Sequence, residues 1–236
     1  MVSRRDAIVL LFSLFLITIV YSDVEQSDLD IGDTESLNVT YFTSELVGGN
    51  ITTNNISGNT STGKWAAVYG NASDSFIFLG SGSGAAPTGI FYEWDWNVTS
   101  GGKICAVRAP GNTDWSDLNN VSSIYVDTVW GFNSSHVDSA NKTFNSTPAD
   151  FTMAGQTVVN CSRAKTGPRI PEDPYYTNLL KMISGNPTSK NEFAFCTELN
   201  GTGVTFKNES YNYELIMPTN STPSTTETYY LYMELT

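Results

Sequence analysis

The sequence predicts a mainly β protein, a β-sandwich of jelly-roll or immunoglobulin-like type with one or two short helices laid against it. From Leu37 onward, short apolar stretches alternate with Gly, Asn, Ser and Thr, a pattern typical of a β-rich domain. In residues 228–235 the side chains at odd positions form one apolar face, as in a half-buried strand. Aromatic residues make up 12% of the chain, which indicates a folded chain with a hydrophobic core.

The N-terminus predicts export from the cell. Arg4 and Arg5 precede an uncharged, mostly apolar run of 15 residues at positions 7–21, and small residues precede Asp23. As a helix this run would rise about 22 Å, less than the ~30 Å of a bilayer core. We therefore expect residues 1–22 to be a cleaved signal peptide rather than an N-terminal anchor. Residues 23–36 then form an acidic lead-in segment, and residues 37–236 a single domain.

The first half of the domain is predicted to consist of strands. Residues 64–69 and 75–79 flank a loop of hairpin length that contains Asn71. Residues 90–96 (IFYEWDW) form the clearest strand, which places Tyr92, Trp94 and Trp96 on one face. Residues 103–109 continue as a further strand.

Two helices are predicted in the second half. Apolar residues recur at intervals of three and four over residues 118–130, and Gly131 stands where that helix would stop. Asp173 and Pro174 open a second candidate helix that Gly185 ends. The remaining strands are predicted at 192–197, 203–206, 213–217 and 228–235.

The chain is unusually rich in acceptor triplets for N-linked glycans. Fourteen of its 21 asparagines begin an Asn-X-Ser/Thr triplet without proline, whereas its 54 Ser and Thr in 236 residues predict about five by chance. N-linked glycans are bulky and lie on the surface of secreted proteins. The predicted glycosylation sites are Asn38, Asn50, Asn55, Asn59, Asn71, Asn97, Asn120, Asn133, Asn141, Asn145, Asn160, Asn200, Asn208 and Asn220.

The net charge excludes two classes of partner. A formal net charge of −12 repels nucleic acid and anionic lipid, so neither is expected as a main partner. A membrane contact would come only from residues 7–21 if they are uncleaved.

The cysteines predict a disulfide. Cys105, Cys161 and Cys196 predict one disulfide and one remaining thiol in an oxidising compartment, and their spacing does not choose among the three pairings. A metal site is not expected, because there is no Cys-X-X-Cys and only one histidine.

No pattern of catalytic residues is present in the sequence. The single histidine, His136, lies between two predicted elements and is read as a surface residue rather than as a catalytic base. There is no Gly-X-Ser-X-Gly motif and no phosphate-binding glycine loop followed by Lys. We therefore expect no enzymatic activity and no cofactor.

Two features bear on binding. Tyr92, Trp94 and Trp96 could form a flat platform on which sugars stack, although three rings on one face of a strand more often face a core. The strand at 228–235 could add to the sheet edge of a neighbouring molecule, although completion of its own sheet is the simpler reading.

Several segments resemble a family of uncharacterised secreted archaeal cell-surface glycoproteins. They are residues 45–52 (ELVGGNIT), 64–65 (KW), 68–73 (VYGNAS), 92–94 (YEW), 131–133 (GFN), 213–218 (YELIMP) and 228–232 (TYYLY). The likeness spans about residues 45–235, and its motifs mark turns and strands rather than catalytic groups. The resemblance implies exposure at the cell surface.

These observations together predict a non-enzymatic, N-glycosylated cell-surface protein that self-associates as the subunit of an extracellular filament, sheath or lattice. The alternative is a carbohydrate-binding or adhesive surface module that uses the aromatic residues of strand 90–96.

Overall fold

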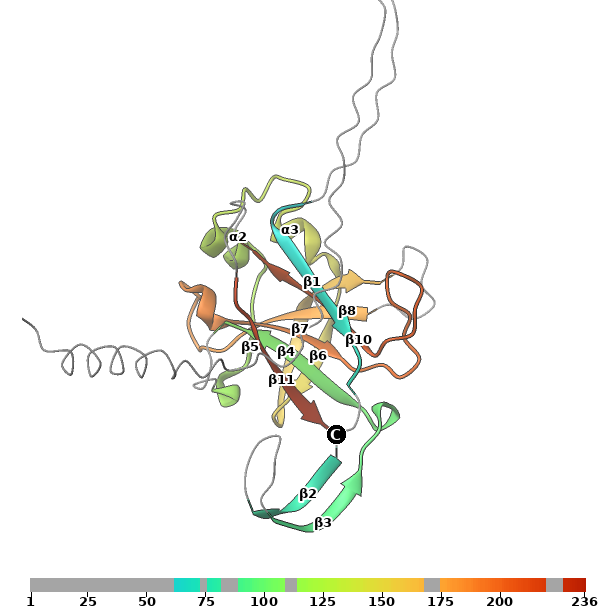
Figure 1. Ribbon diagram of the computed structural model, residues 1–236. Coiled ribbons are helices and arrows are strands. Elements are labelled where there is room, and N and C mark those ends of the chain that lie inside the picture. The colour runs from blue at the N-terminus through green and yellow to red at the C-terminus, as the bar shows by residue number, and fades with distance from the viewer. Residues whose placement is uncertain (1–61, 73–75, 82–88, 109–113, 168–174, 220–226) are drawn as a thin grey trace, which may run out of the picture. The chain divides into compact units, whose positions relative to one another are not determined.

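The computed structural model describes residues 62–72, 76–81, 89–108, 114–167, 175–219 and 227–236 (Figure 1). All of them belong to the second of the two units into which the chain divides, Thr62–Thr236. The predicted signal peptide and acidic lead-in lie outside the described residues, as do five predicted glycosylation sites, Asn38, Asn50, Asn55, Asn59 and Asn220. The described unit is mainly β, as predicted.

A large antiparallel sheet forms the centre of the fold. The strand order is β11-β4-β9-β8-β7-β6, and the short β5 pairs with β8. The strands of this sheet are β4 (Gly102–Val107), β5 (Asn119–Asn120), β6 (Ser146–Met153), β7 (Gln156–Thr166), β8 (Tyr175–Lys181), β9 (Phe193–Glu198) and β11 (Tyr230–Leu235).

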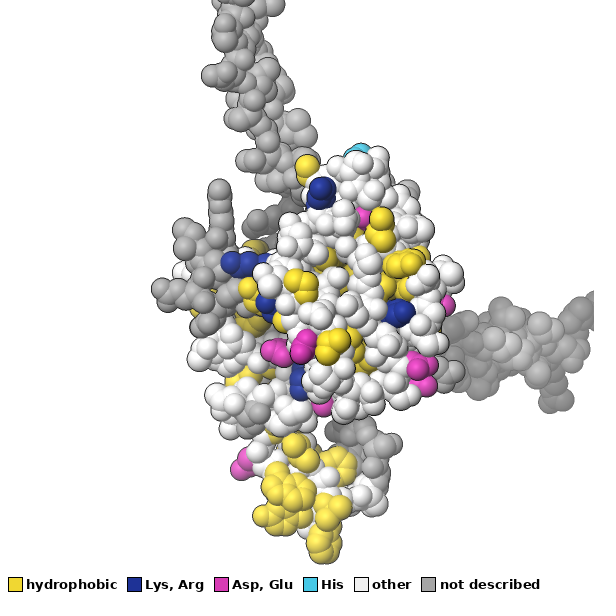
Figure 2. Space-filling model, turned by 180° about the vertical axis from the view of Figure 1, so that it is seen from behind, with side chains coloured by type: hydrophobic (Ala, Val, Ile, Leu, Met, Phe, Trp, Pro, Cys, Tyr) yellow, Lys and Arg dark blue, Asp and Glu magenta, His cyan; other side chains and the backbone are white. Residues whose placement is uncertain are grey.

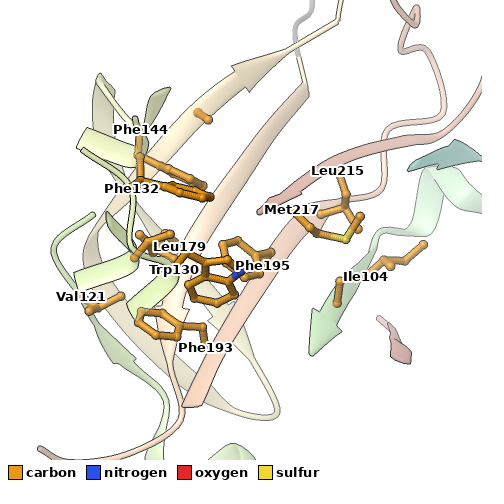
Figure 3. Close-up of a cluster of buried hydrophobic side chains, with 14 of the residues drawn as sticks. Ile104, Val121, Trp130, Phe132, Phe144, Leu179, Phe193, Phe195, Leu215 and Met217 are labelled. Carbon is orange, nitrogen blue, oxygen red and sulfur yellow. The ribbon is translucent and has the colours of Figure 1, made fainter. Parts of the chain in front are cut away.

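One face of this sheet packs against a second layer, which makes the fold a β-sandwich. That layer contains the antiparallel pair β1 (Trp65–Gly70) and β10 (Tyr213–Pro218), with the helices α2 (Ile124–Trp130) and α3 (Ala140–Thr143). The larger core lies between the two layers. It brings Phe193 and Phe195 of β9 together with Trp130 of α2 and with Leu215 and Met217 of β10 (Figure 3).

The opposite face of the sheet holds a second core. Cys105 and Val107 of β4 point there, as do Ala194 and Cys196 of β9, because successive side chains of a strand alternate between faces. The tip of the β6–β7 hairpin folds back over this face and contributes Phe151, Met153 and Val158. The Ala154 N–H at that tip donates to the Glu234 carboxylate of β11 at 2.7 Å, so the hairpin reaches the far edge strand.

The predicted helix at 118–130 is confirmed in its second half only. α2 begins at Ile124, because Asn119 and Asn120 pair with β8 as the short strand β5. It ends at Gly131, as predicted, where a φ of 71° lets the Gly131 N–H donate back to the Asp127 and Thr128 carbonyls. Three 3-10 turns complete the helical content of the described residues: η1 (Val98–Ser100), η2 (Trp115–Asp117) and η3 (Lys190–Glu192).

The second predicted helix, opening at Asp173 and Pro174, is wrong: the segment forms β8. This strand lies between β7 and β9 and is covered on both faces, with Leu179 in the larger core and its neighbour Leu180 in the second core. A strand buried on both sides has no polar face, so its apolar residues do not alternate. Their spacing imitates a helix.

The pairing of the first strands also differs from the prediction. Strands do form at residues 65–70 and 76–81, but they are not a hairpin: β1 pairs with β10, and β2 (Phe76–Ser81) pairs with β3 (Gly89–Asp95). Residues 203–206 form only an isolated bridge between Val204 and Ser210. β6 and β7 were not predicted, because their apolar residues are interrupted by register shifts and by Asn160 at a positive φ of 55°.

The last strand completes its own sheet: β11 pairs with β4 along its whole length, from Tyr230 opposite Val107 to Leu235 opposite Gly102. The segment before it is held by buried contacts. The Glu227 carboxylate is 2% exposed and forms ion pairs with Arg108 and Lys190. The Tyr229 hydroxyl donates to the Pro218 carbonyl at 2.7 Å, and burial raises the pKa of Tyr229.

Candidate functional site

The predicted glycan acceptor asparagines that fall within the described residues lie on the outside of the described unit. Nine of the fourteen fall within the described residues: Asn71, Asn97, Asn120, Asn133, Asn141, Asn145, Asn160, Asn200 and Asn208. Eight of these nine are exposed, Asn200 is half-buried, and none is buried. Attached sugars at these nine positions would therefore not obstruct either core.

Three of these asparagines share a local geometry that suits attachment. The Oδ1 atoms of Asn97, Asn133 and Asn200 each accept the backbone N–H two residues later, at 2.9–3.0 Å. This Asx turn fixes the side chain through its oxygen. The amide nitrogen, to which an N-linked sugar is attached, is not the atom used in the turn.

Two acceptor sites are neighbours on the surface. The Asn120 Nδ2 donates to the backbone carbonyl of Asn160 at 2.7 Å. An N-linked sugar leaves one hydrogen on that nitrogen, so the hydrogen bond and a glycan on Asn120 are compatible. The two sites would place sugars side by side.

A second surface feature is the hairpin of β2 and β3. All seven residues of β3 are exposed. Ile77 stands opposite Trp94, and Leu79 opposite Tyr92, so these four side chains share one face of the hairpin. We call them the hairpin apolar face. Their exposed fractions are 42%, 49%, 55% and 56% for Ile77, Trp94, Leu79 and Tyr92, and hydrophobic side chains gather on this hairpin in Figure 2.

The predicted aromatic platform is only partly present. Tyr92 and Trp94 are exposed, with ring centroids 4.8 Å apart, so the expectation that they face a core is wrong. Trp96 is only 8% exposed, belongs to the larger core, and donates from its Nε1 to the Gly101 carbonyl at 2.8 Å. β3 ends at Asp95, and the chain then turns into η1, so the alternation does not extend to Trp96.

Three exposed residues of the hairpin were missed by the sequence analysis. Ile77 and Leu79 were read as partners of residues 64–69, and Phe91 was not singled out. Phe91 is 84% exposed at a break in the β2–β3 register. The signal was present: residues 76–79 are apolar at every position, which does not fit a strand with one solvated face.

The cysteines form one disulfide and leave one thiol, as predicted. Cys105 and Cys196 stand directly opposite each other on β4 and β9 and are bonded. Cys161 is free and buried in the second core, and burial raises its pKa to about 11. A thiol in this state is protonated at neutral pH and inaccessible, so it is not a reactive group.

A polar groove of about 300 Å³ is lined by residues of β6, β7, β8 and β9 and of the segment that follows β9. Its lining includes Asp150, Arg163, Tyr176, Glu198 and Asn200. The Arg163 guanidinium stacks on the Tyr176 ring, 4.0 Å from its centroid. The guanidinium therefore occupies one face of that ring. The sequence analysis did not find this groove, because it depends on β6 and β7.

A smaller pocket of about 220 Å³ lies beside β10, with Val68, Phe206 and Leu215 among its lining residues. The Glu214 carboxylate also lines it, is 5% exposed, and accepts the Phe206 N–H at 2.8 Å. Burial raises the pKa of Glu214 above its ordinary value of 4.5. The charged form is thus less favourable in the folded protein than in the unfolded chain.

Glu214→Gln tests this electrostatic cost. The pKa of Glu214 is higher in the folded protein than in the unfolded chain, where it is 4.5. The wild type therefore loses folding stability as the pH rises from 4.5 through the folded-state pKa, and loses none at lower pH, where Glu214 is protonated in both states. Gln retains an acceptor for the Phe206 N–H and carries no charge. We expect the Tm of the variant to exceed that of the wild type at about pH 7 and to equal it at about pH 3, in thermal unfolding followed by circular dichroism. A Tm difference that does not change with pH would contradict the assignment.

His136 is exposed, as predicted. Its Nδ1 is 3.2 Å from the Lys64 Nζ, and Lys64 is ion-paired with Asp138. In the part of the chain that the structure describes, no three His, Cys, Asp or Glu side chains are grouped so that they could hold a metal ion. Within the same residues, no helix has both the length and the apolar character needed to cross a membrane.

Comparisons with protein-family models, with curated proteins and with solved structures gave no match to this chain.

Proposed function

We propose that this protein is a non-enzymatic, N-glycosylated structural protein of the cell surface that self-associates into an extracellular filament, sheath or lattice. The observation that carries the proposal is the exposure of the acceptor asparagines: none of the nine within the described residues is buried. Asparagine is mostly exposed in folded proteins, so this exposure counts together with the excess of triplets, fourteen where about five are expected by chance.

Other features agree with an extracellular location. The disulfide between Cys105 and Cys196 is of a kind that forms and persists in oxidising compartments. The net charge of −12 favours solubility and keeps the protein away from nucleic acids. Each of these is weaker support than the acceptor sites.

Mass spectrometry of the native protein tests the proposal. In glycopeptides we expect sugars on most of the eight exposed acceptors, with lower occupancy at the half-buried Asn200. The same spectra report whether the mature chain begins near Asp23. Unmodified asparagines at all fourteen positions would overturn the proposal, and electron microscopy of the cell surface would show whether the protein forms ordered arrays or threads.

A second candidate function, a carbohydrate-binding or adhesive module, is favoured by one observation. The exposed rings of Tyr92 and Trp94 lie 4.8 Å apart between centroids and could stack on a sugar. Trp94→Ala removes one ring without disturbing either core. If this candidate is correct, the variant loses binding on a glycan array while its unfolding transition stays unchanged.

A further inference from the structure

The strand that could have linked one molecule to the next is not free to do so. β11 pairs with β4, and the buried Glu227 carboxylate ties the preceding segment to Arg108 and Lys190. Donating β11 to a neighbour would break this ladder and leave buried charges without partners. Self-association therefore requires a different surface.

Among the described residues, the hairpin apolar face is an exposed apolar surface of this kind. A two-stranded hairpin is marginally stable alone in water and normally needs a third strand or an apolar partner. Here Ile77, Leu79, Tyr92 and Trp94 are each between 42% and 56% exposed. Packing another apolar face against them would remove this surface from water and stabilise the hairpin.

The area of this face suits a weak, reversible contact between two copies. Aromatic side chains bury about 150–250 Å² each, so the half-exposed rings of Tyr92 and Trp94 offer on the order of 100 Å² apiece. Ile77 and Leu79 are also about half exposed, so the face offers on the order of 400 Å² and two copies packed together bury about 800 Å². That is the size of a transient interface rather than of a permanent one.

The distribution of charge permits a second copy at this face. The chain carries a net charge of −12, which opposes self-association, so a contact between copies is best made where charge is absent. The hairpin apolar face carries no charge, and the two acids of β3, Glu93 and Asp95, stand opposite Phe78 and Phe76 on the other face. Two molecules can therefore approach face to face with the carboxylates directed outward.

We propose that two copies of this chain dock through the hairpin apolar face, packed about a two-fold axis as two small sheets in contact. This inference rests on the proposed self-association and names its surface. A two-fold contact closes on itself, so the dimer is the building unit, and a separate contact would extend it into a filament or lattice.

Sedimentation velocity of the full-length secreted protein tests the docking. We expect Tyr92→Asp with Trp94→Asp to raise the dimer Kd by at least about 100-fold, because each substitution acts twice in a two-fold contact and aromatic anchors dominate such interfaces. The matched control is Ile124→Asp with Val137→Asp, which places the same charges on exposed apolar residues outside the hairpin. The control should leave the Kd unchanged.

Crosslinking identifies the face. Leu79→Cys lies on the apolar face, whereas Glu93→Cys lies on the opposite face, and the buried Cys161 thiol does not compete. With a short bismaleimide we expect covalent dimers from the first variant and none from the second. Equal crosslinking of both variants would overturn the face-to-face arrangement.

The outcomes separate this inference from the proposed function. If the wild type assembles and the Asp variants assemble equally well, the hairpin is not the contact, but self-association stands. If the wild type stays monomeric and microscopy shows no surface assembly, the proposed self-association fails as well. A different outcome is a monomeric wild type that binds phosphatidylcholine vesicles or arrayed glycans. If the Asp variants then fail to bind them, the face binds lipid or sugar and the docking is overturned.

Discussion

Replacing Cys105 and Cys196 together by Ala is expected to lower the free energy of unfolding by about 4 kcal/mol. The bonded residues are 91 positions apart, so the disulfide closes a long loop in the unfolded chain and reduces its entropy. A loop of this length contributes between about 2 and 5 kcal/mol in proteins of this size. Because domains are stable by only about 5–15 kcal/mol, the loss would be a large fraction of the total.

Chemical denaturation of the double variant and of the wild type measures this effect. Reduction of the wild type should produce a smaller shift in the same direction, because both sulfur atoms then stay in the core. Cys161→Ala is the control, since Cys161 is as buried as the other two but forms no bond. Removing its sulfur leaves a small void and should cost about 1 kcal/mol. A double variant no less stable than this control would contradict the stabilising role of the disulfide.

The success of the sequence analysis depended on how locally each feature is encoded. The end of α2 was predicted because Gly131 supplies the positive φ at the position where the helix stops. The strands at 90–96, 192–197 and 213–217 were found from short apolar segments. Each of these features needs only neighbouring residues.

The failures involve contacts between distant residues. β1 was paired with the next strand along the chain, but Ala66 stands opposite Met217, and sequence alone does not indicate such a partner. β8 was read as a helix because both of its faces are covered by elements that are remote in the sequence. The polar groove was missed for the same reason, since four strands contribute to it.

The candidate sites show the same division. Each acceptor triplet is encoded by three consecutive residues, so it can be read from the sequence. Those within the described residues are not buried, which is what attachment of a glycan requires. The hairpin apolar face combines two strands. In the sequence its residues are simply apolar, so they were expected to be buried in a core. Trp96 fulfilled that expectation while Trp94, two residues earlier, did not, because the chain turns after Asp95.

Phe195→Ala should have one of the largest effects of any single substitution, a loss of about 3–5 kcal/mol in the free energy of unfolding. Phe195 is fully buried in the larger core, where its ring packs against those of Trp130, Phe144 and Tyr229 at centroid distances of 6.2–6.3 Å. These neighbours come from α2, from the residue after α3 and from the residue before β11, and they cannot all move to fill the cavity. Equilibrium denaturation in urea measures the loss.

Phe91→Ala is the matched control, because it removes the same atoms from a residue that is 84% exposed. Measured at protein concentrations below the dimer Kd, it should change the free energy of unfolding by less than about 0.5 kcal/mol. At higher concentrations, association adds equally to the apparent stability of the wild type and of this variant, because Phe91 is not part of the hairpin apolar face. If both substitutions destabilised the dilute protein equally, Phe91 would have to be packed against other residues rather than exposed.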